Sequence, residues 1–389
     1  MKQVCYLTYF QSRGGETDYP EMWKIFPAVG DKAMLLRVMR KARQYNAIVS
    51  FHQNLDVFDA EADCVDGNFI ARDCNGALFN GGYWHPNQLL RISLPNYRRQ
   101  VRTHIDRLVK TYAISQTYHL DQYSGDPYSY DANPRRPWPS KEFVRGKLEI
   151  LKDFNARGID VTSECLTHPY VGHIGHSWSL FNSGAYWAGE RAVPFTQFIY
   201  HHAISWNSSN ASTIDTMLDS LIEGGGCGLS WPMGDFIPAE GRIEVIPTSW
   251  NQVCDALYLL QQPYVLLRGR KWTDVVAKGS VRRVVYGRRS YIEVDDAAKR
   301  YRVVVDGRVM AKDFVTVVPA PDGRAMIAYA RAPTKLKWRA PSTWKDGPLR
   351  ACALTPSGAG LRIDASVQKG MIRLQLPAQT PVRLERKRP

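Results

Sequence analysis

Strand-like and helix-like segments alternate through the first two-thirds of the amino-acid sequence. Apolar residues spaced about 3.6 positions apart predict helices at residues 32–45, 95–112, 140–157, 211–223 and 248–262. Short runs rich in β-branched and aromatic residues predict strands at residues 4–10, 47–52, 115–121, 159–164, 195–201 and 226–231. Strands that alternate with helices in this way form parallel sheets joined by right-handed crossovers. The fold is therefore restricted to an open doubly wound sheet or a (β/α) barrel.

The residues that follow these strands favour the barrel. No GxGxxG or GxxxxGK motif comes after any of the strands, so the nucleotide-binding forms of the open sheet lose support. Polar and aromatic residues gather instead where the strands end, and barrel enzymes take their functional residues from the ends of many strands. We predict a (β/α)8-type TIM barrel over residues 1–267. Because only six strands are clear, we expect the barrel to be incomplete at its N-terminus.

The sequence pattern changes at about residue 268. Apolar and polar residues then alternate with a period of two, and turn sequences such as "DGR" and "PDGR" separate the runs. This pattern is typical of antiparallel strands. We predict that residues 268–389 form a small antiparallel β-sandwich domain.

The chain is strongly basic, with 51 Lys and Arg against 37 Asp and Glu and a net charge of +14. Much of this charge lies in the last third, where apolar strand residues interrupt it, so a solvated sheet face explains it better than a nucleic-acid interface. No apolar segment is long enough to span a bilayer, so we expect no membrane association. The first residues carry no secretion signal, which predicts a cytoplasmic location as the sequence is written. An extracellular or periplasmic location would apply if the true N-terminus is missing.

The seven cysteines form no CxxC pair, which makes a zinc ribbon an unfavourable interpretation. Their odd number and wide scatter suggest mainly reduced, buried thiols. Cys64 and Cys74 are close enough in sequence to close a loop disulfide in an oxidising compartment.

Two carboxylates stand where consecutive predicted strands end. Asp121 lies in "YHLDQYSGDP" and Glu164 in "DVTSECLTHPY". Neighbouring parallel strands are about 4.8 Å apart, so these side chains can approach the roughly 5–5.5 Å separation of a retaining glycosidase pair. One carboxylate would attack the anomeric carbon, while the other would protonate the leaving oxygen and then activate water. The alternative is that each carboxylate only caps the loop or helix that follows it.

The sequence neighbours of the two carboxylates suggest different roles. Apolar or small residues surround Glu164, namely Val161, Cys165 and Leu166. They would raise the pKa of Glu164 and suit it to the acid/base role. Potential hydrogen-bond donors stand beside Asp121, namely His119, Gln122 and Tyr123. They would keep Asp121 ionised as the nucleophile.

Further polar and aromatic residues near strand ends are candidates for substrate binding. Imidazole and amide groups can bind sugar hydroxyls, and aromatic rings can stack on sugar faces, although each residue could equally pack in the core. The candidates are His52, Asn54, Trp84, His119, Tyr123, His168, His173, Trp178, Trp231 and Asp235.

These strand-end motifs resemble the catalytic barrel of glycoside hydrolase family 101 and its relative family 129. The similarity rests on "HQN" at 52–54, on the strand that ends at Asp121, on the strand that ends at Glu164, and on the C-terminal β-domain. The resemblance implies a retaining enzyme that acts on α-linked N-acetylgalactosamine or galactose-type glycans. It also implies that Asp121 is the nucleophile and Glu164 the acid/base, with no cofactor. The sequence differs from the family pattern in lacking the large N-terminal β-domain.

Two other interpretations stay open on the sequence alone. The first is a metal-dependent barrel hydrolase with ligands drawn from His52, His119, Asp121, His173 and His176. The second is a catalytically silent carbohydrate-binding protein. A carbohydrate is the expected partner in the glycosidase and binding interpretations, and the sequence does not determine the oligomeric state.

Overall fold

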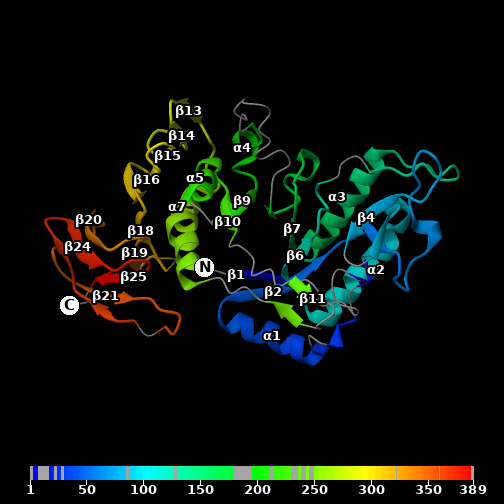
Figure 1. Ribbon diagram of the computed structural model, residues 1–389, viewed down its shortest axis with the longest axis horizontal. Coiled ribbons are helices and arrows are strands. Elements are labelled where there is room, and N and C mark those ends of the chain that lie inside the picture. Colours follow the sequence, from blue (N-terminus) through cyan, green and yellow to red (C-terminus); the bar gives the residue numbers. More distant parts are fainter. Residues whose placement is uncertain are drawn as a thin grey trace. The chain divides into compact units, whose positions relative to one another are not determined.

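The computed structural model groups the chain into two compact units (Figure 1). The first unit comprises Met1–Asn182 and Phe236–Arg242, and the second comprises Ser183–Asp235 and Ile243–Pro389. The division predicted between residues 267 and 268 stays a prediction. The structure describes residues 3–7, 17–21, 24–27, 30–84, 87–125, 129–178, 195–210, 214–228, 235–237, 242–244, 249–320, 322–358 and 360–386.

A parallel sheet forms the centre of the first unit. Its strands lie in the order β1 (Gln3–Leu7), β2 (Ala47–Gln53), β6 (Gln116–Leu120), β7 (Ile159–Ser163) and β8 (His176–Ser177). Each described pairing within it is parallel. The sheet curls like part of a barrel, and a closed eight-stranded barrel stays a prediction. The strands predicted at residues 47–52, 115–121 and 159–164 are confirmed.

Three helices accompany this sheet, as the 3.6-residue spacing predicts. They are α1 (Lys32–Gln44), α2 (Leu94–Tyr112) and α3 (Ser140–Ala156). Helix α1 packs on β2, α3 packs on β7, and α2 packs on α3 (Figure 1). The buried face of α3 includes Phe143, Ile150 and Phe154, so its apolar side faces the core.

Short elements between β2 and α2 were not predicted. Strands β3 (Val57–Asp59), β5 (Asn87–Arg91) and β4 (Asn80–Trp84) form a small antiparallel sheet. A 3-10 turn, η2 (Gly67–Phe69), lies between β3 and β4 in the chain, and η3 (His168–Tyr170) follows β7. The thiols of Cys64 and Cys74 are both free, so the suggested disulfide is absent.

The second unit begins with helices and two short parallel strands. These are α4 (Phe195–Tyr200), β9 (Ser205–Asn210), α5 (Ile214–Glu223), β10 (Gly226–Gly228), α6 (Trp250–Cys254), η4 (Asp255–Gln261) and α7 (Gln262–Val265). The strand predicted at residues 195–201 is wrong, because this segment forms α4. Its aromatic residues favour strands, but Phe195, Phe198 and Ile199 also have the i, i+3, i+4 spacing of a helix face. Strands β11 (Asp235–Ile237) and β12 (Arg242–Glu244) form a separate two-stranded sheet at the segment Phe236–Arg242, which belongs to the first unit.

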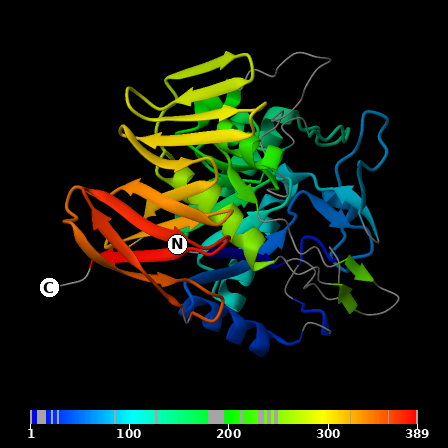
Figure 2. The ribbon, with the colours of Figure 1, turned by 60° about the vertical axis from the view of Figure 1, so that its left-hand side comes forward.

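Antiparallel strands make up the rest of the second unit, which confirms the all-β character predicted from residue 268 onward (Figure 2). The sandwich arrangement stays a prediction. The strands are β13 (Asp274–Lys278), β14 (Val281–Val285), β15 (Tyr291–Asp295), β16 (Arg300–Val305), β17 (Arg308–Lys312), β18 (Val315–Pro319), β19 (Ala325–Ala330), β20 (Thr334–Arg339), β21 (Gly347–Ala353), β22 (Arg362–Ile363), β23 (Ala365–Gln368), β24 (Met371–Leu376) and β25 (Val382–Arg386).

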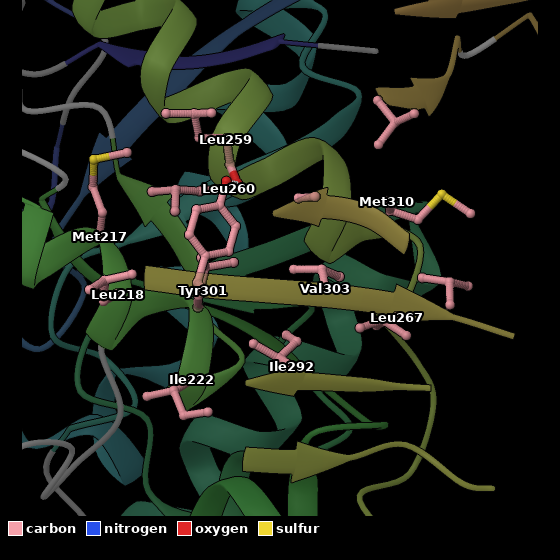
Figure 3. Packing of buried hydrophobic residues seen from close by; sticks show 14 of the residues in the cluster. Met217, Leu218, Ile222, Leu259, Leu260, Leu267, Ile292, Tyr301, Val303 and Met310 are labelled. Carbon is pink, nitrogen blue, oxygen red and sulfur yellow. Dashed lines mark hydrogen bonds between the residues drawn. The ribbon is translucent and has the colours of Figure 1, made fainter. Parts of the chain in front are cut away.

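Helices α5 and η4 cover part of this sheet with an apolar core (Figure 3). The core includes Met217, Leu218, Ile222, Leu259, Leu260, Ile292, Tyr301 and Val303. Each such side chain contributes about 1.5–3 kcal/mol when it is fully buried. No helix in the described part of the chain is both long and apolar enough to cross a membrane.

Candidate functional site

The register of the parallel sheet brings the two predicted carboxylates to equivalent positions. In the pairing of β6 with β7, Leu120 lies opposite Ser163, and each is the last residue of its strand. Asp121 and Glu164 therefore come one residue past the same paired row. Since the carboxyl ends of parallel strands meet at one edge of a sheet, both carboxylates belong to that edge.

Strand alternation, together with its contact to His52, places Asp121 on the face of the sheet opposite the helices. Tyr118 of β6 stacks on Phe154 of α3, with ring centroids 5.3 Å apart, so Tyr118 points toward the helices. Successive side chains of a strand point to opposite faces, and residues two apart share one. His119 and Asp121 therefore lie on the face opposite the helices. By the same register, Thr162 pairs with His119 and shares this face, and Glu164 comes one residue after the end of β7.

Asp121 is held by residues from the neighbouring strand β2. Asn54 Nδ2 donates to Asp121 Oδ2 at 3.2 Å, and His52 Nε2 lies 3.5 Å from Asp121 Oδ1. The backbone N–H of Asp121 donates to Gln53 O at 2.8 Å. The Asp121 side chain keeps 13% of its surface exposed. These contacts leave the carboxylate oriented but still accessible.

These donors differ from the predicted ones, because the described contacts of the carboxylate come from β2 and not from its sequence neighbours. Tyr123, predicted both as a donor and as a substrate contact, is fully buried. Its hydroxyl donates to Lys147 O on α3 at 3.5 Å, and burial raises the pKa of the phenol well above its usual value. We therefore assign Tyr123 a packing role.

His119 is fully buried, and its ring packs against the rings of His52 and Trp178. Its Nδ1 lies 2.8 Å from Thr162 Oγ1, and its ring stacks on Trp178 with centroids 4.0 Å apart and planes 22° apart. The His52 ring meets it edge-on at 4.8 Å. Burial, and then the nearby His52 and His176, lower the pKa of His119 well below its usual value. The buried imidazole of His119 is therefore neutral, and its ring contacts help to fix the positions of His52 and Trp178.

The turns that follow β6 and β7 are tied together by hydroxyl groups. Ser124 Oγ donates to Glu164 O at 2.7 Å, and Ser124 N donates to Ser163 Oγ at 3.1 Å. Ser163 Oγ in turn donates to Leu120 O at 2.6 Å, and Thr167 Oγ1 donates to Ser124 O at 2.8 Å. This network fixes the backbone of Glu164 relative to the strand that delivers Asp121. Sequence analysis missed it, although Ser163 is an unusual polar residue in a buried strand.

Each carboxylate is followed by a residue in the left-handed region. Gln122 has φ 47° and Cys165 has φ 50°. A non-glycine residue adopts this conformation at a cost, and such strained positions cluster at functional sites. Gly125 allows the two turns to approach, because a Cβ there would lie 3.0 Å from the Cβ of Cys165. The two turns are therefore alike in form and packed together.

The remaining predicted contacts are spread more widely. Trp178, partly exposed, directly follows β8 at the same sheet edge as Glu164. His168 is exposed on η3, and His173 lies in the next turn, where its carbonyl accepts from Asn155 Nδ2 at 3.4 Å. Trp84 ends β4 and Asp235 begins β11, but their side chains lie outside the described part of the structure, as does all of Trp231. Their roles stay predictions.

The arrangement of these histidines does not make a metal site. Nowhere in the described part of the chain do three or more His, Cys, Asp or Glu side chains gather as they would around a metal ion. All five ligands proposed for a metal-dependent hydrolase lie in the described part of the chain. His52 and His119 contact each other ring to ring, and His52 is directed to the carboxylate of Asp121. Among the described residues, the metal-dependent interpretation therefore has no ligand set.

Comparison with known proteins agrees with this geometry at the level of the fold. No protein-family model matches the sequence, and neither does any curated protein. The alpha-N-acetylgalactosaminidase NagBb from Bifidobacterium bifidum, in complex with GalNAc, matches over 79% of this chain and 50% of its own, with a TM-score of 0.67 and 14% identity. This likeness shows that the chain shares the fold of that enzyme. The family resemblance is thus confirmed for the fold, and the particular family stays a prediction.

Other structures of NagBb give the same result. Its ligand-free form has a TM-score of 0.65 and its Gal-NHAc-DNJ complex 0.64, both at 14% identity over 78% of this chain. The chain spans about half the length of these structures.

Proposed function

We propose that this protein is a retaining glycoside hydrolase that cleaves α-linked galactosamine or galactose-type glycans. The observation that supports the proposal is the sheet register, in which Asp121 and Glu164 each come one residue past the same paired row of adjacent strands. The glycoside hydrolase fold supports a carbohydrate substrate. Because NagBb is an alpha-N-acetylgalactosaminidase, an α-linked N-acetylgalactosamine is the first substrate to test.

The proposed chemistry runs in two displacements. Asp121 attacks the anomeric carbon as the glycosidic C–O bond breaks, and Glu164 gives its proton to the leaving oxygen. Glu164 then takes a proton from water, which attacks the same carbon and releases Asp121. Two inversions give net retention. The reaction needs no cofactor, because both steps exchange only a proton and a glycosyl group.

The contacts of Asp121 suit the nucleophile. Asn54 and His52 approach different oxygens of its carboxylate, one at 3.2 Å and the other at 3.5 Å. Hydrogen bonds to a charged carboxylate are stronger than neutral ones and fix its orientation. A nucleophile held in this way needs little rearrangement to attack.

Replacement of each carboxylate tests the proposal. We expect Asp121→Asn to reduce kcat for an aryl α-N-acetylgalactosaminide or aryl α-galactoside by at least about 10⁴-fold, because the covalent step is lost. Glu164→Gln should reduce kcat by about 10²–10⁴-fold. Asp63→Asn is the matched control, since Asp63 is an exposed carboxylate that pairs with the surface residue Lys24.

Azide separates the two roles. With Asp121→Ala, azide should restore turnover and give a product of inverted anomeric configuration, whereas with Glu164→Ala it should give a retained glycosyl azide. Proton NMR of the anomeric signal distinguishes them. Full activity of Asp121→Ala would exclude the mechanism. Tight glycan binding by the wild type without any turnover would favour the catalytically silent binding protein.

A further inference from the structure

A buried lysine on α3 joins the two loops that carry Asn54 and Asp121. The side chain of Lys147 is only 1% exposed. Its Nζ donates to Asp56 Oδ2 and, at 2.9 Å, to Tyr123 O. Nζ also lies 4.9 Å from the centroid of the Tyr123 ring. One ammonium group thus binds the loop after β2 and the turn after β6.

In the loop after β2, Asp56 links Lys147 to Asn54. The backbone N–H of Asp56 donates to Asn54 Oδ1 at 2.9 Å. This contact settles the orientation of the amide, because it directs Asn54 Nδ2 toward Asp121, where it donates to Oδ2 at 3.2 Å. The position of Asp56, anchored by Lys147, therefore decides which atom of Asn54 meets the carboxylate.

The turn after β6 is the second branch. Tyr123 is two residues past Asp121, and the left-handed Gln122 lies between them. Lys147 holds the carbonyl of Tyr123, while the Tyr123 hydroxyl returns to the backbone carbonyl of Lys147. The turn is thus fixed to α3 at both ends of this tyrosine. A shift of the ammonium would move the turn that begins at Asp121.

We propose that Lys147 is a positioning residue for the nucleophile, acting through Asp56 and Asn54 on one side and through Tyr123 on the other. This inference rests on the proposed function, since it assigns Asp121 as the nucleophile. A buried ion pair is by itself weak evidence for stability, and fixing a geometry is a better-attested use.

The test removes both charges together, because Lys147→Met alone would take away the ammonium partner of the buried Asp56 carboxylate, and removing one member of a buried ion pair is strongly destabilising. The double variant Lys147→Met/Asp56→Asn avoids this. The matched control is Arg102→Met/Asp153→Asn, which removes an ion pair between α2 and the same helix α3 whose two side chains hydrogen-bond each other. Both are assayed at a temperature at which circular dichroism shows them folded.

We expect the Lys147→Met/Asp56→Asn variant to lose about 10–100-fold in kcat with little change in KM, because a misplaced nucleophile affects the transition state more than substrate binding. Covalent labelling of Asp121 by a 5-fluoroglycosyl fluoride, followed by mass spectrometry, should slow by the same factor. The control variant should keep wild-type kcat and labelling. Equal kcat and labelling rates in both variants would overturn the inference while leaving the proposed function intact.

Hydrogen exchange provides a readout that does not depend on activity. Amides of residues 52–56 and 121–125 should exchange faster together in the Lys147→Met/Asp56→Asn variant and stay protected in the control. Unchanged exchange in either segment would contradict the connection between the loops. If the wild type hydrolyses no glycoside, the proposed function fails, and these exchange data still decide whether Lys147 links the loops.

Discussion

The two sheets of this protein use their buried faces differently. In the first unit, the face of the parallel sheet opposite the helices carries His52, His119 and Thr162 in one paired row, followed by Asp121 beside His52. In the second unit, the helix-covered side of the antiparallel sheet is packed with aliphatic and aromatic residues (Figure 3). Burying polar groups without partners is unfavourable, and on this face His119 Nδ1 lies 2.8 Å from Thr162 Oγ1 while Asn54 donates to Asp121. The first face is polar and the second is apolar.

The difference predicts that core truncation in the second unit changes stability without changing the site. Ile292 of β15 is fully buried among residues of α5 and η4. We expect Ile292→Ala to lower the free energy of unfolding by about 2–5 kcal/mol, because it removes apolar contacts and leaves a cavity. Urea denaturation measures the loss. At a temperature where the variant stays folded, the kcat of the variant should equal that of the wild type, and a reduced kcat would show that the comparison is too simple.

Acid should weaken both units through buried histidines. Burial lowers the pKa of His201, in the second unit, to about 4, and that of His119, in the first, well below its usual value. The unfolded chain binds these protons near pH 6.5 and the folded chain does not, so the free energy of unfolding falls as pH drops below about 6.5. For His201 alone the loss reaches about 3 kcal/mol by pH 4.

Denaturation curves at pH 7 and pH 4.5 check this dependence. His201→Gln should flatten it, since glutamine does not titrate in this range. A wild-type free energy of unfolding that is constant between these two pH values would contradict the neutral, buried state of both histidines.

Replacing Asn54 should have the opposite effect to Ile292→Ala, with a large loss of activity and only a small loss of stability. We expect Asn54→Ala to lower kcat by about 10–100-fold, which corresponds to the roughly 1.5–3 kcal/mol of a hydrogen bond to a charged group. Stability should fall by only about 1 kcal/mol as the Asp56 N–H loses its acceptor. The control is Asn68→Ala. The exposed side-chain amide of Asn68 donates a described hydrogen bond to Asp66. Equal kcat for Asn54→Ala and wild type would remove Asn54 from the site.

The smallest effect is expected on the surface. Lys24 and Asp63 form an exposed ion pair, with side chains 54% and 87% accessible. Asp63→Asn should leave both the free energy of unfolding and kcat almost unchanged, because water and salt screen such pairs. A calorimetric shift larger than that of Asn54→Ala would contradict the ranking of buried over exposed polar contacts.

Much of the first unit follows from local sequence pattern. The segments 32–45, 95–112 and 140–157 have one apolar side at helical spacing, and they form helices within one or two residues of the predicted bounds. The strand predicted at residues 195–201 is wrong because the aromatic composition of this segment favours a strand, whereas the spacing of its apolar residues favours a helix. The small sheet of β3, β4 and β5 gave too short a pattern to detect.

The sequence by itself determined that Asp121 and Glu164 end consecutive strands, because periodicity marks where each strand stops and one crossover joins them. Only the tertiary structure decided what surrounds Asp121. His52 and Asn54 precede it by more than sixty residues and become its neighbours because β2 lies beside β6 in the sheet. Lys147 reaches the same region from a helix. Local pattern specifies which way a side chain points, whereas the order of strands, set by packing of the whole unit, specifies what it meets.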